Sequence, residues 1–157
     1  MKIGIVGLGL IGGSFAQATS RRTHHEVYGF DTHAPSLERA LGEKAIQHRL
    51  TEENVGQMDL LLLAVVPHLA VAYVEKHAAQ IRGMVMDLCG IKRAVSRHIR
   101  PLAEKHGFLY IGGHPMAGRE NGGYANASPQ MFDGASMILV PHTEIPESIN
   151  AYLRALG

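Results

Sequence analysis

Three glycines near the N-terminus have the spacing of a phosphate-binding turn. Gly7, Gly9 and Gly12 lie between an apolar run expected to be a strand, Ile3–Val6, and an apolar run compatible with a helix, Leu10–Thr19. The first glycine permits a tight turn, the second lets the backbone approach phosphates without a Cβ in the way, and the third allows the helix to pack closely on the strand. The unpaired N–H groups at the helix start would bind the pyrophosphate of a dinucleotide.

An acidic residue stands where such a turn needs one. Asp31 follows the expected strand Glu26–Phe30, about twenty residues after Gly12. Its carboxylate would accept hydrogen bonds from the adenine ribose and repel the 2′-phosphate of NADP, and no arginine follows it directly. We therefore predict NAD as the cofactor rather than NADP, although a helix N-cap or a turn would also explain an aspartate here. Further cofactor contacts are expected at the helix start and after the next buried strand, from Leu10, Ile11, Val65, Val66 and Pro67.

A histidine is the best candidate for proton transfer. His114 follows the expected strand Phe108–Ile111 and opens a long glycine-rich segment that continues to Gly134. A neutral imidazole accepts a proton near pH 7, and long loops in compact domains are often functional, so this segment is expected to form the substrate side of the site. None of the ten histidines stands in an H-E-x-x-H or Cys/His array, so no metal site is predicted.

Alternating strands and helices are expected to position these residues. The pattern predicts one α/β domain over residues 1–157, a Rossmann-type, doubly wound and mainly parallel sheet. Further strands are expected at Ala45–Gln47, Asp59–Val65, Met84–Leu88 and Ala135–Val140, and further helices at Pro35–Leu41, His68–Arg82, Ile91–Leu102 and Ile145–Leu156. The third of these helices contains Pro101, which is expected to kink or restart it.

The composition limits the classes of partner. Hydrophobic residues make up 46% and charged residues 18% of the chain, which is typical of a globular protein. The net charge of +1 does not provide the excess of positive charge that binding to nucleic acid or an acidic membrane requires. The longest apolar run, Leu60–Val66, is far shorter than a membrane span, and glycines interrupt the N-terminal run too often for a signal peptide. The single cysteine, Cys89, fits a reducing compartment and a small buried role. We expect a soluble cytoplasmic protein.

Four features together resemble prephenate dehydrogenase: the glycine turn, Asp31, the stretch Asp87–Lys92 and the motif His114-Pro-Met-Ala-Gly118. Arogenate dehydrogenases share this pattern. The resemblance implies oxidation and decarboxylation of prephenate to 4-hydroxyphenylpyruvate on the route to tyrosine, with NAD or NADP accepting the hydride. It also implies that His114 hydrogen-bonds the ring hydroxyl of the substrate and draws off its proton. The match covers the nucleotide-binding half of that family, whose helical domain supplies the dimer interface and an arginine for a substrate carboxylate.

Two departures from the family pattern matter. Gly90 stands where the family usually has a serine close to the histidine and the cofactor. The helical domain would be expected to follow Gly157, so the chain as given is expected to bind NAD better than it turns over prephenate, and the full-length protein is expected to be a homodimer. Lys92 and Arg119 are candidates for a substrate carboxylate. The alternatives are a solvated lysine at Lys92 and a surface or phosphate-facing role for Arg119. A β-hydroxyacid dehydrogenase and a non-catalytic NAD-binding regulatory module are the competing functions.

Overall fold

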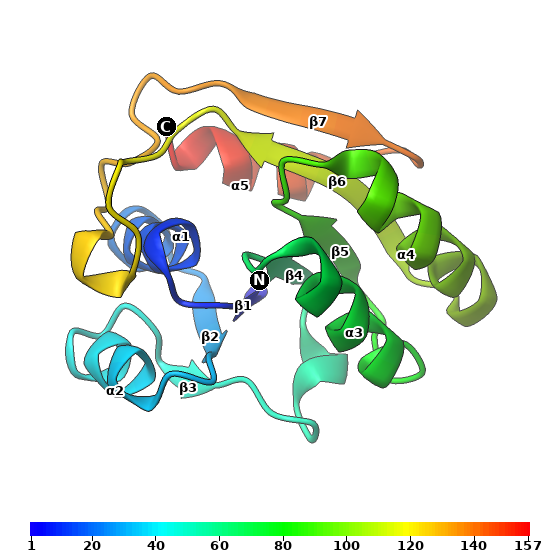
Figure 1. The fold of residues 1–157 in the computed structure, drawn as a ribbon, viewed down its shortest axis with the longest axis horizontal. Helices are drawn as coiled ribbons and strands as arrows, with labels where there is room; N and C mark the ends of the chain where they lie inside the picture. The colour runs from blue at the N-terminus through cyan, green and yellow to red at the C-terminus, as the bar shows by residue number, and fades with distance from the viewer.

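Seven strands form one sheet in the order β3-β2-β1-β4-β5-β6-β7 (Figure 1). The computed structural model describes residues 1–157. The first six strands run parallel, and β7 is antiparallel to β6 at the sheet edge. The sheet is therefore doubly wound and mainly parallel, as the sequence predicts. The strands are β1 (Lys2–Val6), β2 (Glu26–Phe30), β3 (His48–Arg49), β4 (Leu60–Leu63), β5 (Met84–Asp87), β6 (Leu109–Pro115) and β7 (Met137–Pro141).

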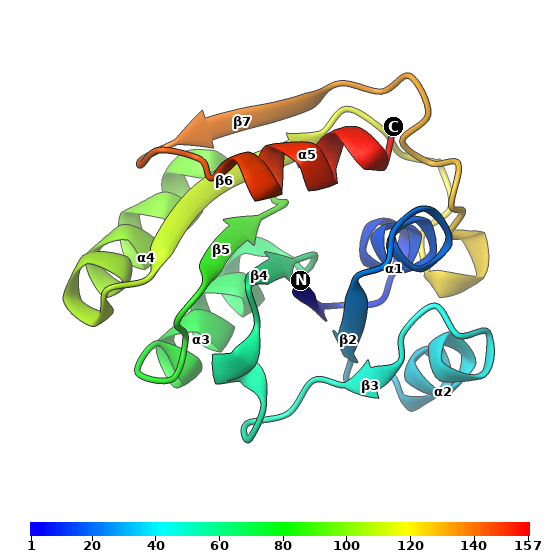
Figure 2. The ribbon, with the colours of Figure 1, turned by 180° about the vertical axis from the view of Figure 1, so that it is seen from behind.

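Helices cover both faces of the sheet (Figures 1 and 2). On one face lie α1 (Leu10–Arg22), α2 (Ala34–Gly42) and α5 (Glu147–Ala155), and on the other α3 (Pro67–His77) and α4 (Lys92–His106). Two short 3₁₀ helices, η1 (Val55–Gln57) and η2 (Tyr124–Asn126), lie in the connections. No helix in the structure combines the length and the apolar composition needed to cross a membrane.

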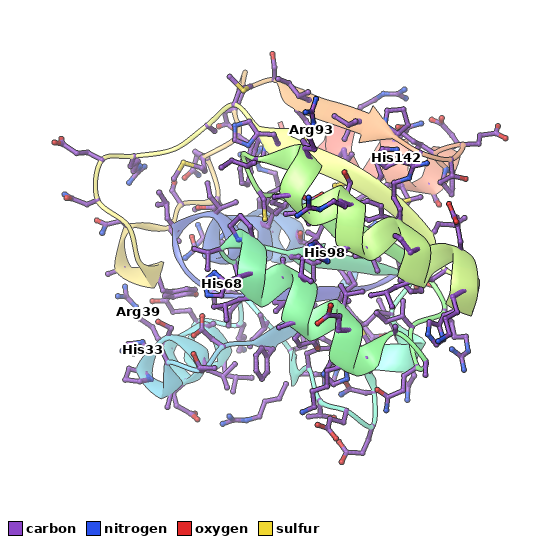
Figure 3. All side chains as sticks on the ribbon, turned by 45° about the vertical axis from the view of Figure 1, so that its right-hand side comes forward. His33, Arg39, His68, Arg93, His98 and His142 are labelled. Atoms are coloured by element: carbon purple, nitrogen blue, oxygen red, sulfur yellow. The ribbon has the colours of Figure 1, made fainter.

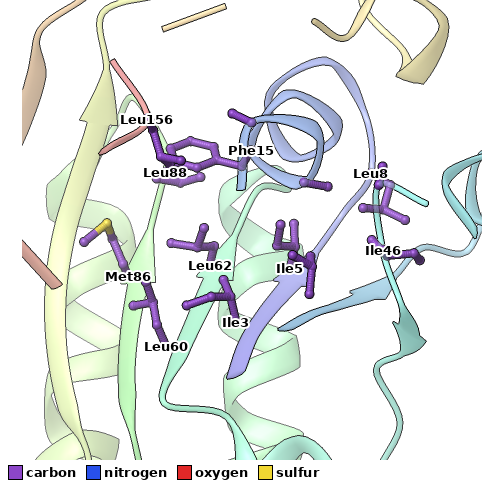
Figure 4. Packing of buried hydrophobic residues seen from close by; sticks show 14 of the residues in the cluster. Ile3, Ile5, Leu8, Phe15, Ile46, Leu60, Leu62, Met86, Leu88 and Leu156 are labelled. Carbon is purple, nitrogen blue, oxygen red and sulfur yellow. The ribbon is translucent and has the colours of Figure 1, made fainter. Parts of the chain in front are cut away.

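The apolar run of β4 shows why the sequence forms a sheet covered on both sides. Leu60 and Leu62 join the core beneath α1 and α5, part of which Figure 4 shows, whereas Leu61 and Leu63 join the core beneath α3 and α4. Successive strand residues point to opposite faces, so a central parallel strand must be apolar at every position. The two cores hold β1 between β2 and β4, where the strand order reverses. Ligands of open α/β sheets bind at such a point.

Several element boundaries differ from those expected. The third strand is His48–Arg49 and not Ala45–Gln47, because Ala45 and Ile46 are buried in the turn that leaves α2. Helix α3 ends at His77, well before Arg82. The helix containing Pro101 runs without interruption as α4.

Two large apolar residues near the starts of α3 and α4 are exposed. Leu69 of α3 is 50% exposed, whereas its neighbour Ala70 faces the core. Ile91 is 67% exposed and serves as the N-cap of α4.

The most consequential difference concerns β6. The sequence predicts a strand that ends at Ile111 and a loop that carries His114. In the structure β6 continues to Pro115, because β7 pairs with its second half, His114 opposite Ile138. The histidine is therefore fixed in a strand.

Candidate cofactor and active site

The glycine turn forms a cradle at the start of α1. Gly7 has φ +90°, a left-handed conformation that favours glycine, and its N–H donates to the Phe30 carbonyl at 2.8 Å. A Cβ on Gly12 would overlap the carbonyl oxygen of Gly7, so only glycine lets the helix approach the turn this closely. A Cβ on Gly9 would meet nothing within 4 Å, so that position is open to a ligand.

Helix α1 begins without a side-chain cap. Gly9 occupies the N-cap position and provides no side chain to bond the first N–H groups, and the first turn carries no acidic residue. The N–H groups of Leu10 and Ile11 therefore remain available for an anion at the positive end of the helix. This arrangement suits the pyrophosphate of a dinucleotide.

The carboxylate of Asp31 is fixed by backbone donors. Its Oδ2 accepts from the N–H of Leu8 at 2.6 Å, and its Oδ1 accepts from the N–H of His33 at 2.7 Å. The first bond joins the end of β2 to the glycine turn. The carboxylate is thus held beside the turn, where it can accept hydrogen bonds from a ribose.

A pocket of about 260 Å³ lies on one side of Asp31. Its lining is mainly apolar and includes Val65 from the end of β4, Leu69 and Tyr73 from α3, and Phe30 from β2. The rings of Phe30 and Tyr73 lie 5.6 Å apart between centroids. A flat, largely apolar adenine ring fits such surroundings. Of the other two residues predicted after β4, Val66 is 52% exposed as the N-cap of α3 and Pro67 is the first residue of that helix.

A larger and more polar pocket, about 440 Å³, lies on the other side of Asp31. Gly9, His33, Ser36 and Arg39 contribute to its lining. Figure 3 shows His33 and Arg39 at the same corner of the molecule, on the side of α2. Arg39 was not predicted from the sequence, because it does not follow Asp31 directly. Arg39 follows Pro35 by four residues, so the two lie on the same face of the expected helix, and this spacing could have indicated the arginine.

His114 lies at the carboxyl edge of the sheet with one imidazole nitrogen unpaired. Its Nδ1 is buried and has no hydrogen-bond partner within the chain. Gly90 is its neighbour, since a Cβ built on Gly90 would lie 3.7 Å from Cε1 of His114. Gly90 and His114 are therefore adjacent, as the family resemblance implies. A buried imidazole nitrogen without a partner is costly unless a ligand or water completes its hydrogen bonding, which marks His114 as a place where a ligand could bind.

Lys92 is neither solvent-facing nor available to a substrate carboxylate. Its ammonium forms an ion pair with the fully buried carboxylate of Asp87 and donates to the carbonyl of Gly113. The hydroxyl of Tyr110 donates to the other oxygen of Asp87 at 2.7 Å, and the N–H of Cys89 donates to Oδ1 at 3.1 Å. This network joins α4, β5 and β6 at Gly113, the residue before His114, which makes Lys92 a structural residue.

Cys89 is inert in this environment. It is buried, and its Sγ lies 3.3 Å from the carbonyl oxygen of Val65. Burial, and secondarily the charge of Asp87, raise the pKa of the thiol to about 11. The thiol therefore stays protonated near pH 7, and its S–H is directed at the Val65 carbonyl.

The segment after β6 does not form a free substrate loop. Its middle packs on α1: Tyr124 is buried against Gly13, where a Cβ would be 2.7 Å from the tyrosine ring, and the N–H of Ser128 donates to the Ser14 hydroxyl at 3.0 Å. Arg119 donates to the carbonyl of Asn126 at 3.3 Å and stays exposed. This part of the segment therefore lies beside the cofactor turn and not, as predicted, at the substrate.

Comparisons of the sequence with known proteins agree with this geometry. The family model described as "Prephenate dehydrogenase, nucleotide-binding domain" matches residues 15–156. Probable prephenate dehydrogenase NovF of Streptomyces niveus is 30% identical over 138 residues, which cover 87% of this chain and 37% of that protein. Cyclohexadienyl dehydrogenase of Zymomonas mobilis is 27% identical, with 96% and 53% covered. The chain thus spans between about a third and about half of these relatives.

Solved structures show the same architecture. Arogenate dehydrogenase of Synechocystis superposes with a TM-score of 0.84 at 29% identity, covering 99% of this chain and 55% of that one. Prephenate dehydrogenase of A. aeolicus, solved with hydroxyphenyl propionate and NAD+, also gives 0.84, at 23% identity, covering 100% and 57%. The fold is therefore shared over the whole chain.

Proposed function

Since the chain belongs to the prephenate dehydrogenase family, we propose that residues 1–157 form the NAD-binding domain of an enzyme that oxidises and decarboxylates prephenate to 4-hydroxyphenylpyruvate. The observation that carries the proposal is the uncommitted Nδ1 of His114, on the sheet edge that also bears the glycine turn. NAD, when bound, supplies the acceptor for the hydride. A homodimer and a cytoplasmic location are part of the same proposal.

The residues of this chain then have distinct tasks. The amides at the start of α1 hold the pyrophosphate, and Asp31 accepts hydrogen bonds from the adenine ribose. His114 hydrogen-bonds the ring hydroxyl of the substrate and takes its proton as the hydride leaves the same carbon. Loss of CO₂ then restores the aromatic ring, so the protein mainly aligns two reactants and polarises one hydroxyl.

Calorimetric titration of the 157-residue chain tests the cofactor half of this proposal. NAD is expected to bind, and more tightly than NADP, because the fixed carboxylate of Asp31 opposes a 2′-phosphate. Tighter binding of NADP would overturn the assignment of Asp31.

The substrate half needs a polypeptide that also carries the helical domain expected from the family. His114→Asn is expected to lower turnover of prephenate by about two to four orders of magnitude with nearly unchanged NAD affinity, which is the usual contribution of general acid–base catalysis. The formation of NADH reports turnover. Normal activity of the variant would remove His114 from the mechanism.

Two other functions remain to be separated by these assays. Similarity to arogenate dehydrogenase of Synechocystis favours a parallel assay with arogenate, whose turnover in preference to prephenate would reassign the substrate. Gly90, which leaves His114 without a neighbouring hydroxyl, favours an NAD-binding regulatory module. NAD binding without turnover of either substrate in the complete protein would support that second function.

A further inference from the structure

Arg39 lies in the pocket that the adenine ribose would share. The residue belongs to α2 and lines the 440 Å³ pocket together with Asp31, His33 and Ser36. Its side chain is 54% exposed, so a ligand in this pocket can reach the guanidinium. An arginine beside the ribose hydroxyls is the group that would recognise a 2′-phosphate, because its planar fork matches phosphate oxygens.

Glu43 forms an ion pair with this guanidinium. The Nε of Arg39 lies 2.7 Å from Oε1 of Glu43, one turn further along the chain. The other oxygen, Oε2, accepts from the hydroxyl of Tyr124 at 3.1 Å, and the guanidinium lies 5.7 Å from the centre of the tyrosine ring. Tyr124 comes from the segment packed on α1, so Glu43 is held from two sides.

The charges of Arg39, which lines the pocket, and Glu43, which pairs with it, offset each other. The hydrogen bond to Arg39 lowers the pKa of Glu43, and the same bond raises the pKa of Arg39. Both groups are therefore ionised near pH 7, and together they present no net charge to a ligand. Asp31 adds one uncompensated negative charge on the same pocket.

We propose that Glu43 is a second determinant of cofactor choice: by neutralising Arg39, it deprives a 2′-phosphate of the cation that would offset Asp31. The inference rests on the proposed binding of NAD at Asp31. It explains how a pocket that contains an arginine still selects a 2′-hydroxyl. An i, i+4 pair that only supports helix α2 would have no effect on the choice between NAD and NADP.

Titration of variants with NAD and NADP tests the proposal. Glu43→Gln is expected to shift the affinity ratio toward NADP about threefold to tenfold, the size expected for one unit charge acting on a phosphate dianion across a well-hydrated gap. Glu38→Gln is the matched control, because Glu38 lies on α2 but pairs with Arg49, an arginine that does not line the pocket. It makes the same change in net charge and should leave the ratio unchanged.

A second set of variants identifies the cation. Asp31→Asn combined with Glu43→Gln should favour NADP more than either change alone. Adding Arg39→Gln to that pair should abolish the gain contributed by Glu43→Gln. Three results would each overturn the proposal. The first is an affinity ratio for NADP over NAD that is unchanged in Glu43→Gln, and the second is an equal shift of that ratio in Glu38→Gln. The third is a gain from Glu43→Gln that persists when Arg39 is also replaced. Failure of the unaltered chain to bind NAD would instead refute the proposed function.

Discussion

Replacement of Lys92 by methionine is expected to destabilise the domain strongly. Methionine keeps most of the apolar stem that crosses β6, where a Cβ on Gly112 would meet Lys92 Cδ at 2.9 Å, but it removes the ammonium. Asp87 is 0% exposed and would retain only the donors from Tyr110 and Cys89. A buried carboxylate that loses its cation costs about 3–5 kcal/mol.

The cost can be measured as a change in unfolding free energy. For a domain of about 150 residues, 1 kcal/mol corresponds to roughly 2–4 °C, so the melting temperature should fall by roughly 6–20 °C. Urea denaturation followed by circular dichroism gives the free energy, provided that the m-value is unchanged. Tyr110→Phe serves as the comparison, because it removes one hydrogen bond to the same carboxylate and should cost only about 1–3 kcal/mol.

A double variant separates charge from packing. Lys92→Met together with Asp87→Asn should recover part of the lost stability, because the buried group no longer carries an uncompensated charge. A loss below about 1 kcal/mol in Lys92→Met, or a double variant no more stable than the single one, would refute the reasoning. NAD affinity should change little in all folded variants, since the glycine turn belongs to β1 and α1.

Three further predictions concern the glycines of the site and the buried thiol of Cys89. Gly12→Ala should lower the free energy of unfolding by about 1–3 kcal/mol and should also weaken NAD binding. Gly9→Ala, where the added methyl group faces open space, should keep its stability in urea denaturation and lose only NAD affinity. Gly90→Ser should raise the turnover of the complete protein about threefold to tenfold by giving the imidazole of His114 a hydroxyl partner, and Gly90→Ala, measured in the same assay, should not. Cys89 should react with iodoacetamide far more slowly than a thiol in the unfolded chain at pH 8, and the rate should rise up to pH about 11; fast labelling of the folded chain would contradict the raised pKa. Because this pKa is higher in the folded state, its contribution to stability is complete below the ordinary thiol pKa and is lost as the pH rises toward about 11.

The parts of the fold that depend on local patterns could be predicted from the sequence. The strand Glu26–Phe30 has the expected limits, and the continuous apolar run around β4 correctly indicated a sheet covered on both faces. The order of the sheet follows from the regular alternation of strands and helices, which leaves few topologies open.

The parts that depend on distant partners could not be predicted. His114 was expected in a loop, because nothing near it in the sequence indicates that β7 pairs with it from more than twenty residues away. Lys92 was expected in solvent or at a substrate, because its partner Asp87 becomes a buried carboxylate only when β6 covers it. Arg39 was missed because a pocket brings together residues from separate elements.

The pairing of β6 has a consequence for how the site opens. Residues Leu109–Gly112 pair with β5, but β5 ends opposite Gly112, so the backbone of His114 is held in the sheet by β7 alone. Separation of β7 from β6 would release the histidine while the parallel strands around the glycine turn stay paired. Amide hydrogens of β7 and the end of β6 are therefore expected to exchange with solvent through a local opening of lower free energy than global unfolding, and those of β1 only with the whole domain. The two halves of the site would then have separate stabilities, and a mutation could loosen one without weakening the other.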